Sequence, residues 1–323
     1  MKKNIITLFI IFLFTSSYTQ ITIKDISFEN FPRVDGSTST APLSKIITCK
    51  LLNIDYEWNT EPVGVIWSPN TKYEFWEWVN DTIKQTMPFN NGKVKTSQTH
   101  HAIINLIENK TDIIFSARKI SKDEKNYADS LKITLIETPI ALDALIFIAN
   151  EKRSVKSLTM QQIQDIYMGK IVRWETVGGD SSTLYPLIRN ANSGSQELME
   201  SIAMQGMKMP WNEQQMMENV IHGMPEVFMA LSWEQPQAIC FTIYYYKEMM
   251  IRDNYKGIQT LAINGIEPNR QTIADRIYPY VAEVYAVIRS DLPKNCLAYK
   301  LYEWLQCKEG KEVIKESGYI PIK

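Results

Sequence analysis

The sequence predicts an α/β protein, because strand and helix signals alternate along most of its length. The 323 residues are 45% hydrophobic and 22% charged, so the chain can bury a sizeable core. A single core usually stops growing at roughly 250 residues, which predicts about two domains. Residues 140–150 are nearly all apolar, a pattern typical of a buried parallel strand.

The elements follow one another in a recognisable order. Three segments read as helix N-termini with capping boxes, beginning at Ser121, Thr159 and Ser193. Gly169 and Gly206 are expected to end the second and third of these helices. The other helices are expected at 44–54, 102–107, after Pro225 and at 297–317 with a break near Gly310, and the strands at 113–115, 140–150, 238–246 and 281–288.

The charge balance excludes one broad class of partner. There are 35 Lys and Arg against 36 Asp and Glu, a formal net charge of −1. A nucleic-acid binder normally carries a basic surplus or stripe, so we expect no nucleic-acid partner. With three His and four scattered Cys, no metal site and no cofactor are expected.

The first 19 residues are predicted to be a signal peptide. Lys2 and Lys3 precede an apolar run at 5–14, which is too short to span a bilayer. Ser17 and Thr19 fit a small-x-small cleavage site, so the mature chain is expected to begin at Gln20. No Cys lies near that site, which gives no indication of a lipid anchor. We therefore expect an exported, periplasmic or extracellular protein; an uncleaved N-terminal anchor is the alternative.

Export permits disulfide bonds, but the four Cys suggest no clear pairing. Cys296 and Cys307 flank a helical pattern that would hold them roughly 16 Å apart if one helix spanned both. Cys240 lies in an apolar run and is expected to be a buried thiol. One disulfide among Cys49, Cys240, Cys296 and Cys307 stays possible.

A Trp-rich excursion at residues 56–92 stands apart from the alternating pattern. It is read as loop-rich, with one short helix around 73–85. A locally packed aromatic cluster is the simpler interpretation, and a lid or a docking surface for a partner is the other. The excursion contains Trp58, Trp67, Trp76, Trp78, Pro62, Pro69 and Pro88.

Hydrogen-bond donors gather in loops that precede helices. Residues 35–43 include four consecutive hydroxyl residues before a Pro, and 96–101 carry Thr99, His100 and His101. Residues 189–195 place Arg189 before a Ser-Gly-Ser helix start, and Arg118 follows the strand at 113–115. Free N–H groups at helix N-termini and a guanidinium fork both favour an oxyanion, although ordinary helix caps would look the same. Four such loops could converge on one small anion between two lobes.

Several of these segments resemble the phosphate-binding proteins of ABC uptake transporters. The most specific match is LTMQQIQDIYMGKIVRWETVGG at 158–179. GSTSTAPL at 36–43 resembles the first anion loop of that family, RNANSGS at 189–195 its arginine loop, and GYIP at 318–321 its C-terminal ending. The resemblance covers residue 33 to the C-terminus, apart from the Trp-rich excursion.

The resemblance implies an α/β, two-lobe periplasmic-binding-protein-like fold of type II, hinged by two crossing strands near 140–148 and 280–287. Lobe one would comprise 20–140 and 285–323, and lobe two 141–284. The implied function is delivery of phosphate to an ABC transporter permease by a monomer without catalytic activity. The implied ligand-binding residues are Thr38, Ser39, Thr99, Arg118, Arg189, Ser193, Gly194 and Ser195, with Ser37, His100 and Asp143 as further candidates.

The sequence departs from the family pattern at two places. The second loop lacks the usual Gly residues, and Gln98, Thr99, His100 and His101 stand there instead. His100 or His101 could contact the anion, or could form an exposed pair at a helix start. Some family members also have an Asp at the position of Arg118, which accepts the proton of hydrogen phosphate and so rejects sulfate.

Arg118 cannot accept a proton, so Asp35 or Asp143 would have to serve, although a structural role for Asp143 in its strand is the simpler interpretation. The ligand could therefore be another oxyanion, or the fold could serve an exported sensor or adhesion module. A phosphatase that uses Ser37 or Ser195 with His100 is a remote alternative. Replacing Arg189 with Ala is expected to abolish anion binding.

Overall fold

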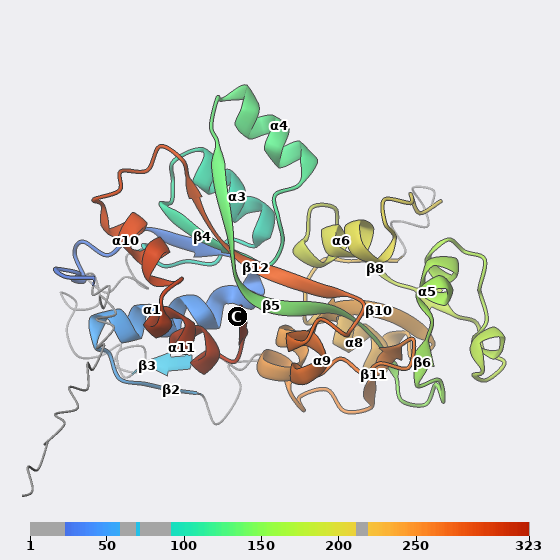
Figure 1. The fold of residues 1–323 in the computed structure, drawn as a ribbon. Coiled ribbons are helices and arrows are strands. Elements are labelled where there is room, and N and C mark those ends of the chain that lie inside the picture. The colour runs from blue at the N-terminus through green and yellow to red at the C-terminus, as the bar shows by residue number, and fades with distance from the viewer. Residues whose placement is uncertain (1–22, 59–68, 72–91, 211–218, 323) are drawn as a thin grey trace, which may run out of the picture.

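The structure is a computed structural model that describes residues 23–58, 69–71, 92–210 and 219–322. Two α/β lobes lie side by side, and two long strands run across the middle of the molecule between them (Figure 1). Lobe one contains the elements between residues 34 and 130 and those from residue 297 onward, and lobe two contains the elements between residues 157 and 274. The two-lobe α/β fold predicted from the sequence is confirmed.

The sheet of lobe one has the order β1-β4-β12-β5. β1 and β4 are parallel, so their carboxyl ends and the loops that follow them lie at the same edge of the sheet. β12 runs antiparallel to both of its neighbours, and β13 pairs with β5 near the C-terminus. The strands of lobe one are β1 (Val34–Gly36), β4 (Ile113–Ser116), β12 (Val281–Arg289), β13 (Ile320–Pro321) and the first part of β5 (Leu135–Asn150).

Lobe two is built on the second part of β5. β10 and β11 both run antiparallel to β5, and each carries a short parallel strand, β7 on β10 and β6 on β11. A separate pair, β8 and β9, is parallel. The strands of lobe two are β6 (Ser157–Leu158), β7 (Tyr185–Pro186), β8 (Ile188–Arg189), β9 (Val220–Ile221), β10 (Ala238–Ile243) and β11 (Ile258–Ile263).

The strand β5 connects the two lobes. Its residues up to Ala144 pair with β12, and those from Leu145 pair with β10. Every residue from Ile140 to Asn150 is buried, as the apolar run predicted. The expectation of parallel pairing is wrong, because β5 is antiparallel to each of its neighbours. A central strand is covered on both faces whatever the direction of its neighbours, so burial did not reveal direction. The lobe boundaries after residues 140 and 284 stay a prediction.

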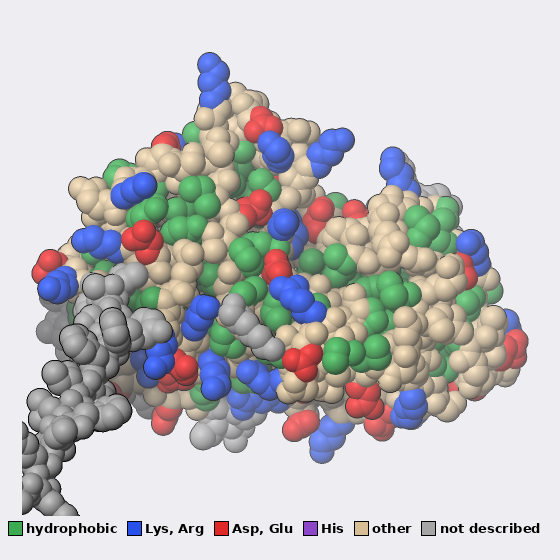
Figure 2. Space-filling view, in the orientation of Figure 1, with side chains coloured by type: hydrophobic (Ala, Val, Ile, Leu, Met, Phe, Trp, Pro, Cys, Tyr) green, Lys and Arg blue, Asp and Glu red, His purple; other side chains and the backbone are tan. Residues whose placement is uncertain are grey.

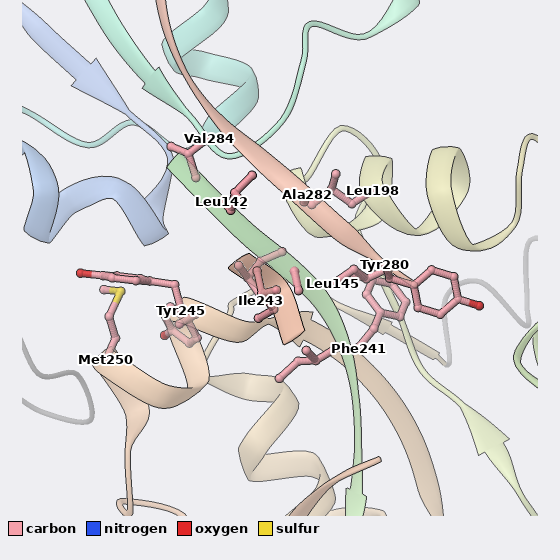
Figure 3. Packing of buried hydrophobic residues seen from close by; sticks show 14 of the residues in the cluster. Leu142, Leu145, Leu198, Phe241, Ile243, Tyr245, Met250, Tyr280, Ala282 and Val284 are labelled. Atoms are coloured by element: carbon pink, nitrogen blue, oxygen red, sulfur yellow. The ribbon is translucent and has the colours of Figure 1, made fainter. Parts of the chain in front are cut away.

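The hydrophobic core continues through the crossing of the strands. Figure 3 shows Leu142 and Leu145 of β5 beside Ala282 and Val284 of β12. Ile243 at the end of β10 packs in the same cluster. Since side chains of both lobes share this core, the lobes meet through packed apolar surface as well as through the chain itself.

The helices begin largely where the sequence predicted. Capping boxes at Ser121 and Thr159 are confirmed. α1 begins earlier than residue 44, because Pro42 occupies its first turn, where a missing N–H costs nothing. The helices and helical turns of the first half are η1 (Thr38–Thr40), α1 (Ala41–Leu52), α3 (Thr99–Ile107), α4 (Lys122–Ser130), α5 (Met160–Tyr167) and η2 (Trp174–Val177).

Only one of the two hydrogen bonds of the capping box predicted at Ser193 is present. Ser193 does cap α6 by accepting from the Gln196 N–H, but the Gln196 side chain accepts from the Arg189 N–H instead of the Ser193 N–H. The helices and helical turns of the second half are α6 (Gly194–Leu198), η3 (Met199–Ala203), α8 (Glu226–Met229), η4 (Ala230–Glu234), η5 (Tyr246–Ile251), α9 (Arg270–Ala274), α10 (Leu297–Trp304) and α11 (Lys308–Glu316).

Two expected boundaries differ from the structure. The strand expected to reach Tyr246 ends at Ile243, because the Tyr245 N–H bonds the carboxylate of Asp143 and the chain turns into η5. The C-terminal helix breaks at residues 305–307 rather than at Gly310. A Cβ on Gly310 would lie 2.2 Å from the carbonyl oxygen of Trp304, so Gly310 is where the two helices meet closely.

The structure bears on three further expectations. The four Cys form no disulfide, and the Cys240 thiol is buried, as predicted. Within the Trp-rich excursion, β2 (Tyr56–Trp58) and β3 (Pro69–Thr71) form an antiparallel pair. The helix expected at 73–85 and the signal peptide lie outside the described residues. Within the described part of the chain, no helix is long and apolar enough to span a membrane.

Candidate functional site

A cavity of about 150 Å³ lies where loops of the two lobes face each other. That volume is smaller than the roughly 300–1,000 Å³ of a pocket for a drug-sized ligand, which suits a small ion better than a nucleotide or a peptide. The lining residues are Ser37, Thr38, Ser39, Gln98, Thr99, His100, His101 and Ala117 from lobe one, and Arg189, Asn190, Ala191, Asn192, Ser193, Gly194, Ser195, His222, Gly223, Met224 and Ile243 from lobe two.

Ser37 joins three loops of lobe one. It follows β1, and its hydroxyl oxygen accepts a hydrogen bond of 2.9 Å from the N–H of Ala117, which follows β4. The same oxygen lies 2.9 Å from Oγ1 of Thr99 at the start of α3. Because β1 and β4 are parallel, the loops that follow them are neighbours. Ser37 holds the hydroxyl of Thr99 beside these two loops.

Asp35 and Tyr319 bind the backbone of the first anion loop, residues 36–43, from positions outside the cavity. Oδ1 of Asp35 accepts from the N–H groups of Gly36 and Ser97, and Oδ2 accepts from the side chain of Asn105. The phenol of Tyr319 donates to the carbonyl oxygen of Ser39 over 3.0 Å. Asp35 is fully buried and does not line the cavity, so its role is to position the first two loops.

The second loop leads into α3 through an unusual backbone conformation. Gln98 has φ 67° and ψ 163°, a region that glycine adopts easily and other residues rarely adopt. Thr99, His100 and His101 form the first turn of the nine-residue helix α3. The N–H groups of such a first turn have no partner within the helix and attract negative charge. The loop lacks the Gly residues that are usual in the family it resembles, yet Gln98 has a conformation typical of glycine.

His100 is oriented by Glu124 of α4. Nδ1 of His100 lies 2.8 Å from Oε1 of Glu124. The same carboxylate binds both terminal nitrogens of Arg118 at 2.8 Å and accepts from the Ser121 N–H. Burial alone would raise the pKa of Glu124, but the hydrogen bonds and charge of Arg118 outweigh it, so the pKa is lowered. Glu124 is therefore an anion that holds His100 on one side and Arg118 on the other.

Arg189 supplies the guanidinium of the arginine loop at residues 189–195. Its Nε donates to the carbonyl oxygen of Ile221 over 3.0 Å, and Nη2 donates to that of His222 over 2.7 Å. Nη1 is buried and has no hydrogen-bond partner. Burial lowers the pKa of Arg189, and no carboxylate of the described residues forms an ion pair with it. The side chain is thus fixed by two backbone carbonyls, with one charged nitrogen left unpaired.

The two lobes touch at the rim of the cavity. Nη2 of Arg118 in lobe one lies 3.3 Å from the carbonyl oxygen of Asn192 in lobe two. A Cβ added to Gly194 would lie 2.7 Å from Oγ1 of Thr99, so only glycine allows this approach of α6 to α3. The arginine loop at residues 189–195 therefore lies close against lobe one at Thr99 and Arg118.

The charges around the cavity favour an anion. No Asp or Glu is among the described residues that line it. All three His of the chain, together with Arg189, do line it. Away from the cavity, basic and acidic side chains are interspersed over both lobes on the face shown in Figure 2. The unbalanced basic character is thus a local property of the cavity.

Most of the residues that the sequence singled out lie together, and three do not. Arg118 is engaged with Glu124, and Asp35 and Asp143 are buried in β1 and β5; none of the three lines the cavity. The candidates that the structure brings together there are Ser37, Thr38, Ser39, Thr99, His100, Arg189, Ser193, Gly194 and Ser195.

Asp143 lies on β5 just before the pairing changes from β12 to β10 between Ala144 and Leu145. Its Oδ1 accepts from the N–H groups of Ala144 and Tyr245, and its Oδ2 is buried without a partner. Burial raises the pKa of this carboxyl to about 7. Asp143 therefore belongs to the crossing of the strands, and its contacts are with backbone rather than with the cavity.

His222 is the most informative residue that the sequence did not single out. It follows β9, whose residue Ile221 pairs with Arg189 of β8. That pairing places His222 beside the arginine loop, although the two lie 33 residues apart. No local pattern marks residue 222, and only the pairing of β8 with β9 reveals it. Gly223, Met224 and Ile243 also line the cavity without a sequence signal.

The chain is similar to known binding proteins in sequence. The family model described as PBP superfamily domain matches residues 75–309. A phosphate-binding protein PstS from Borreliella burgdorferi is 24% identical over 213 residues, which cover 65% of this chain and 72% of that protein. A phosphate-binding protein PstS from Bacillus subtilis is 22% identical over 191 residues, which cover 58% of each chain.

Solved structures show the same fold. An ABC-type phosphate transport receptor from Vibrio cholerae has a TM-score of 0.59 and 20% identity, and the match covers 92% of this chain and 99% of that one. A chain from Clostridium perfringens, assigned as a phosphate ABC transporter substrate-binding protein and solved with bound phosphate, has a TM-score of 0.60 and 18% identity, with the same coverage.

Proposed function

The chain belongs to the family of PBP superfamily domains, and from this premise we propose that it binds phosphate in the cavity between its lobes. It then delivers the anion to the membrane permease of an ABC transporter. The relatives that carry the name phosphate-binding protein PstS support this ligand class. The protein acts without catalysis, as an exported monomer whose leader is residues 1–19.

The observation that carries the proposal is the unpaired nitrogen of Arg189. A buried guanidinium nitrogen without a partner is costly, because the desolvation of its charge is not compensated. An oxyanion in the cavity would supply the missing acceptor and the missing negative charge together. Nε and Nη2 are already bound to backbone carbonyls, so the side chain is fixed before the ligand arrives.

The surrounding groups complete an anion site. Ser37, Thr38, Ser39 and Thr99 provide hydroxyls from lobe one, and Ser193, Gly194 and Ser195 provide donors from lobe two. Hydrogen bonds to a charged group contribute about 1.5–3 kcal/mol each. A handful of them offsets the cost of association and supports micromolar or tighter binding. Donors from both lobes would favour the closed arrangement, as expected of a hinged clamp.

Calorimetric titration of the mature protein tests the proposal. The protein is unfolded and refolded to remove bound ligand, and phosphate and sulfate are then titrated separately at neutral pH. Tight binding of phosphate with little heat from sulfate is expected for a phosphate carrier. Equal binding of both would indicate a general oxyanion binder, and silence for both would contradict the proposal.

Replacement of Arg189 with Ala identifies the site. Removing one partner of a buried charged pair costs about 2–5 kcal/mol, so phosphate affinity should fall at least about thirtyfold. Arg173→Ala is the matched control, because Arg173 is an exposed arginine of the same lobe paired with Glu175 outside the cavity. Thermal unfolding of both variants shows whether they are folded. Unchanged phosphate affinity in a folded Arg189→Ala protein would refute the assignment of the site.

The structure also bears on the phosphatase alternative. Glu124 orients His100 as a carboxylate orients the base of a hydrolase, which the sequence did not reveal. The hydroxyl of Ser37, however, lies against Thr99 and the Ala117 N–H rather than against His100. Ser37 is therefore not placed as a nucleophile for His100. Turnover of a generic phosphate ester that disappears in Ser195→Ala would revive that alternative.

A further inference from the structure

Hydrogen phosphate differs from sulfate by one hydroxyl hydrogen that must be accepted. At neutral pH sulfate carries no proton, whereas phosphate keeps at least one. A site that offers a fixed acceptor to this hydrogen binds phosphate, and places opposed lone pairs against sulfate. Carboxylates do not fill this role among the described residues, because those that line the cavity include none and the candidates Asp35 and Asp143 lie outside it.

The hydrogen bond between His100 and Glu124 determines which ring nitrogen carries the proton. Glu124 is held as an anion by Arg118, and an ionised carboxylate only accepts hydrogen bonds. Nδ1 of His100, 2.8 Å from Oε1 of Glu124, must therefore be the protonated nitrogen. In the neutral ring the other nitrogen, Nε2, then has a free lone pair.

We propose that His100 is the specificity-determining residue of the cavity, with neutral Nε2 accepting the hydroxyl hydrogen of hydrogen phosphate. This inference rests on the proposed function. When His100 gains a proton, Nε2 becomes a donor, and the penalty against sulfate disappears. The same residue thus makes the site selective at alkaline pH and permissive at acidic pH.

Several charged or titratable groups surround His100. On its own helix, the ring of His101 lies 5.7 Å from it in an edge-on arrangement. From α4, Asp123 and Glu124 face it, and Glu197 of α6 adds negative charge near Glu124 and Arg118. Across the cavity lie Arg189 and His222.

A doubly protonated His100 would keep its bond to Glu124, so the change on titration is confined to Nε2.

The test compares the affinities of phosphate and sulfate from about pH 5.5 to about pH 8, the range in which histidine ordinarily titrates. The wild-type protein should discriminate against sulfate at about pH 8, and its ratio of affinities should fall at least about tenfold by about pH 5.5. His100→Gln should lose most of this pH dependence and bind sulfate better at the alkaline end of the range. Because phosphate itself titrates equally in every experiment, the comparison between proteins isolates the residue.

His101→Gln is the matched control, since it removes a neighbouring imidazole from the same helical turn. It can weaken both anions together, but the ratio and its pH dependence should follow the wild type. Nitrogen-15 NMR of the imidazoles gives a second readout, because phosphate should shift the Nε2 resonance of His100 from that of a bare lone pair to that of a hydrogen-bonded one.

The outcomes separate this inference from the proposed function. If the wild type binds phosphate and His100→Gln keeps the wild-type ratio at every pH, the inference is overturned and the proposed function stands. An equal loss of selectivity in His101→Gln would also overturn it, because the effect would then belong to the net charge. If the wild type binds neither anion, both the proposed function and this inference fail.

Discussion

The close approach of the two lobes at the cavity depends on the absence of a side chain at residue 194. Gly194 is the first residue of α6, and its φ lies outside the left-handed region, so its backbone accepts alanine. A Cβ at this position would lie 2.7 Å from Oγ1 of Thr99. Ordinary contact begins near 3.4 Å, so α6 and α3 would have to separate by several tenths of an ångström.

Gly194→Ala is therefore expected to weaken phosphate binding without unfolding the protein. Overpacking of this kind costs about 1–3 kcal/mol, which corresponds to a loss of affinity of about 5- to 150-fold. The cost falls on the packing of one lobe against the other, because Thr99 belongs to lobe one and Gly194 to lobe two. Calorimetry gives the affinity, and the thermal midpoint of the ligand-free variant should stay near that of the wild type.

A double-mutant cycle with Thr99 tests whether the weaker binding comes from a clash with Oγ1 of Thr99. Thr99→Ala removes Oγ1, and the next nearest atom, Cβ of residue 99, lies 3.6 Å from the added methyl group, which is ordinary contact. Thr99→Ala alone loses one hydroxyl donor, but Gly194→Ala should cost little more when it is introduced into that background. If the two substitutions weaken binding additively, the steric argument is refuted.

Two further substitutions test the backbone and the buried charge. Gln98→Gly should stabilise the fold by about 1 kcal/mol, because residue 98 has a positive φ in a region that glycine prefers, and the thermal midpoint should rise by about 1.5 °C. A lower midpoint would contradict this. Asp143 has a folded pKa of about 7, well above the ordinary value of 3.8, so the folded protein holds the proton more tightly. Its stability should therefore fall as pH rises from about 4 to about 7, by at most about 4 kcal/mol, and Asp143→Asn should remove this fall in urea unfolding at about pH 5 and about pH 8. An equally steep fall in the variant would count against the buried carboxyl as its source.

The donor-rich loops could be predicted because their signals are local. A Ser, Thr or Gly before an apolar periodic segment marks a helix start, and helix starts bring N–H groups to one place. Ser37, Thr99 and Arg189 were found in this way and lie together in the cavity. The loops after β1 and β4 meet because these two strands are parallel neighbours. The alternation of strands and helices predicted an α/β fold, but it did not show which strands are neighbours.

Arg118 and His222 show what local signals leave out. Arg118 has the right residue type in a donor loop, but Glu124, six residues later, takes both of its terminal nitrogens. The sequence shows Glu124 as part of a capping box, and a carboxylate can serve as a cap and as an ion partner at once. His222 depends on the register of two short strands, β8 and β9, which carry too few residues for a periodic pattern.

Asp143 illustrates the opposite case. A single carboxyl within an apolar strand suggested a structural hydrogen bond, and its Oδ1 does bind two backbone N–H groups. The sequence could not tell that these groups come from Ala144 and from Tyr245, because the second lies 102 residues away. What the residue type indicated was the kind of interaction, and the fold supplied the partner.

A crystal structure of the mature protein with phosphate would show directly where the anion binds. We expect phosphate in the cavity between the lobes, with one oxygen within about 3 Å of Nη1 of Arg189. Other oxygens should lie near the hydroxyls of Thr38 and Ser195, and the hydroxyl hydrogen should be directed at Nε2 of His100. Phosphate bound elsewhere, or bound in the cavity while Nη1 of Arg189 stays unpaired, would refute the proposed site.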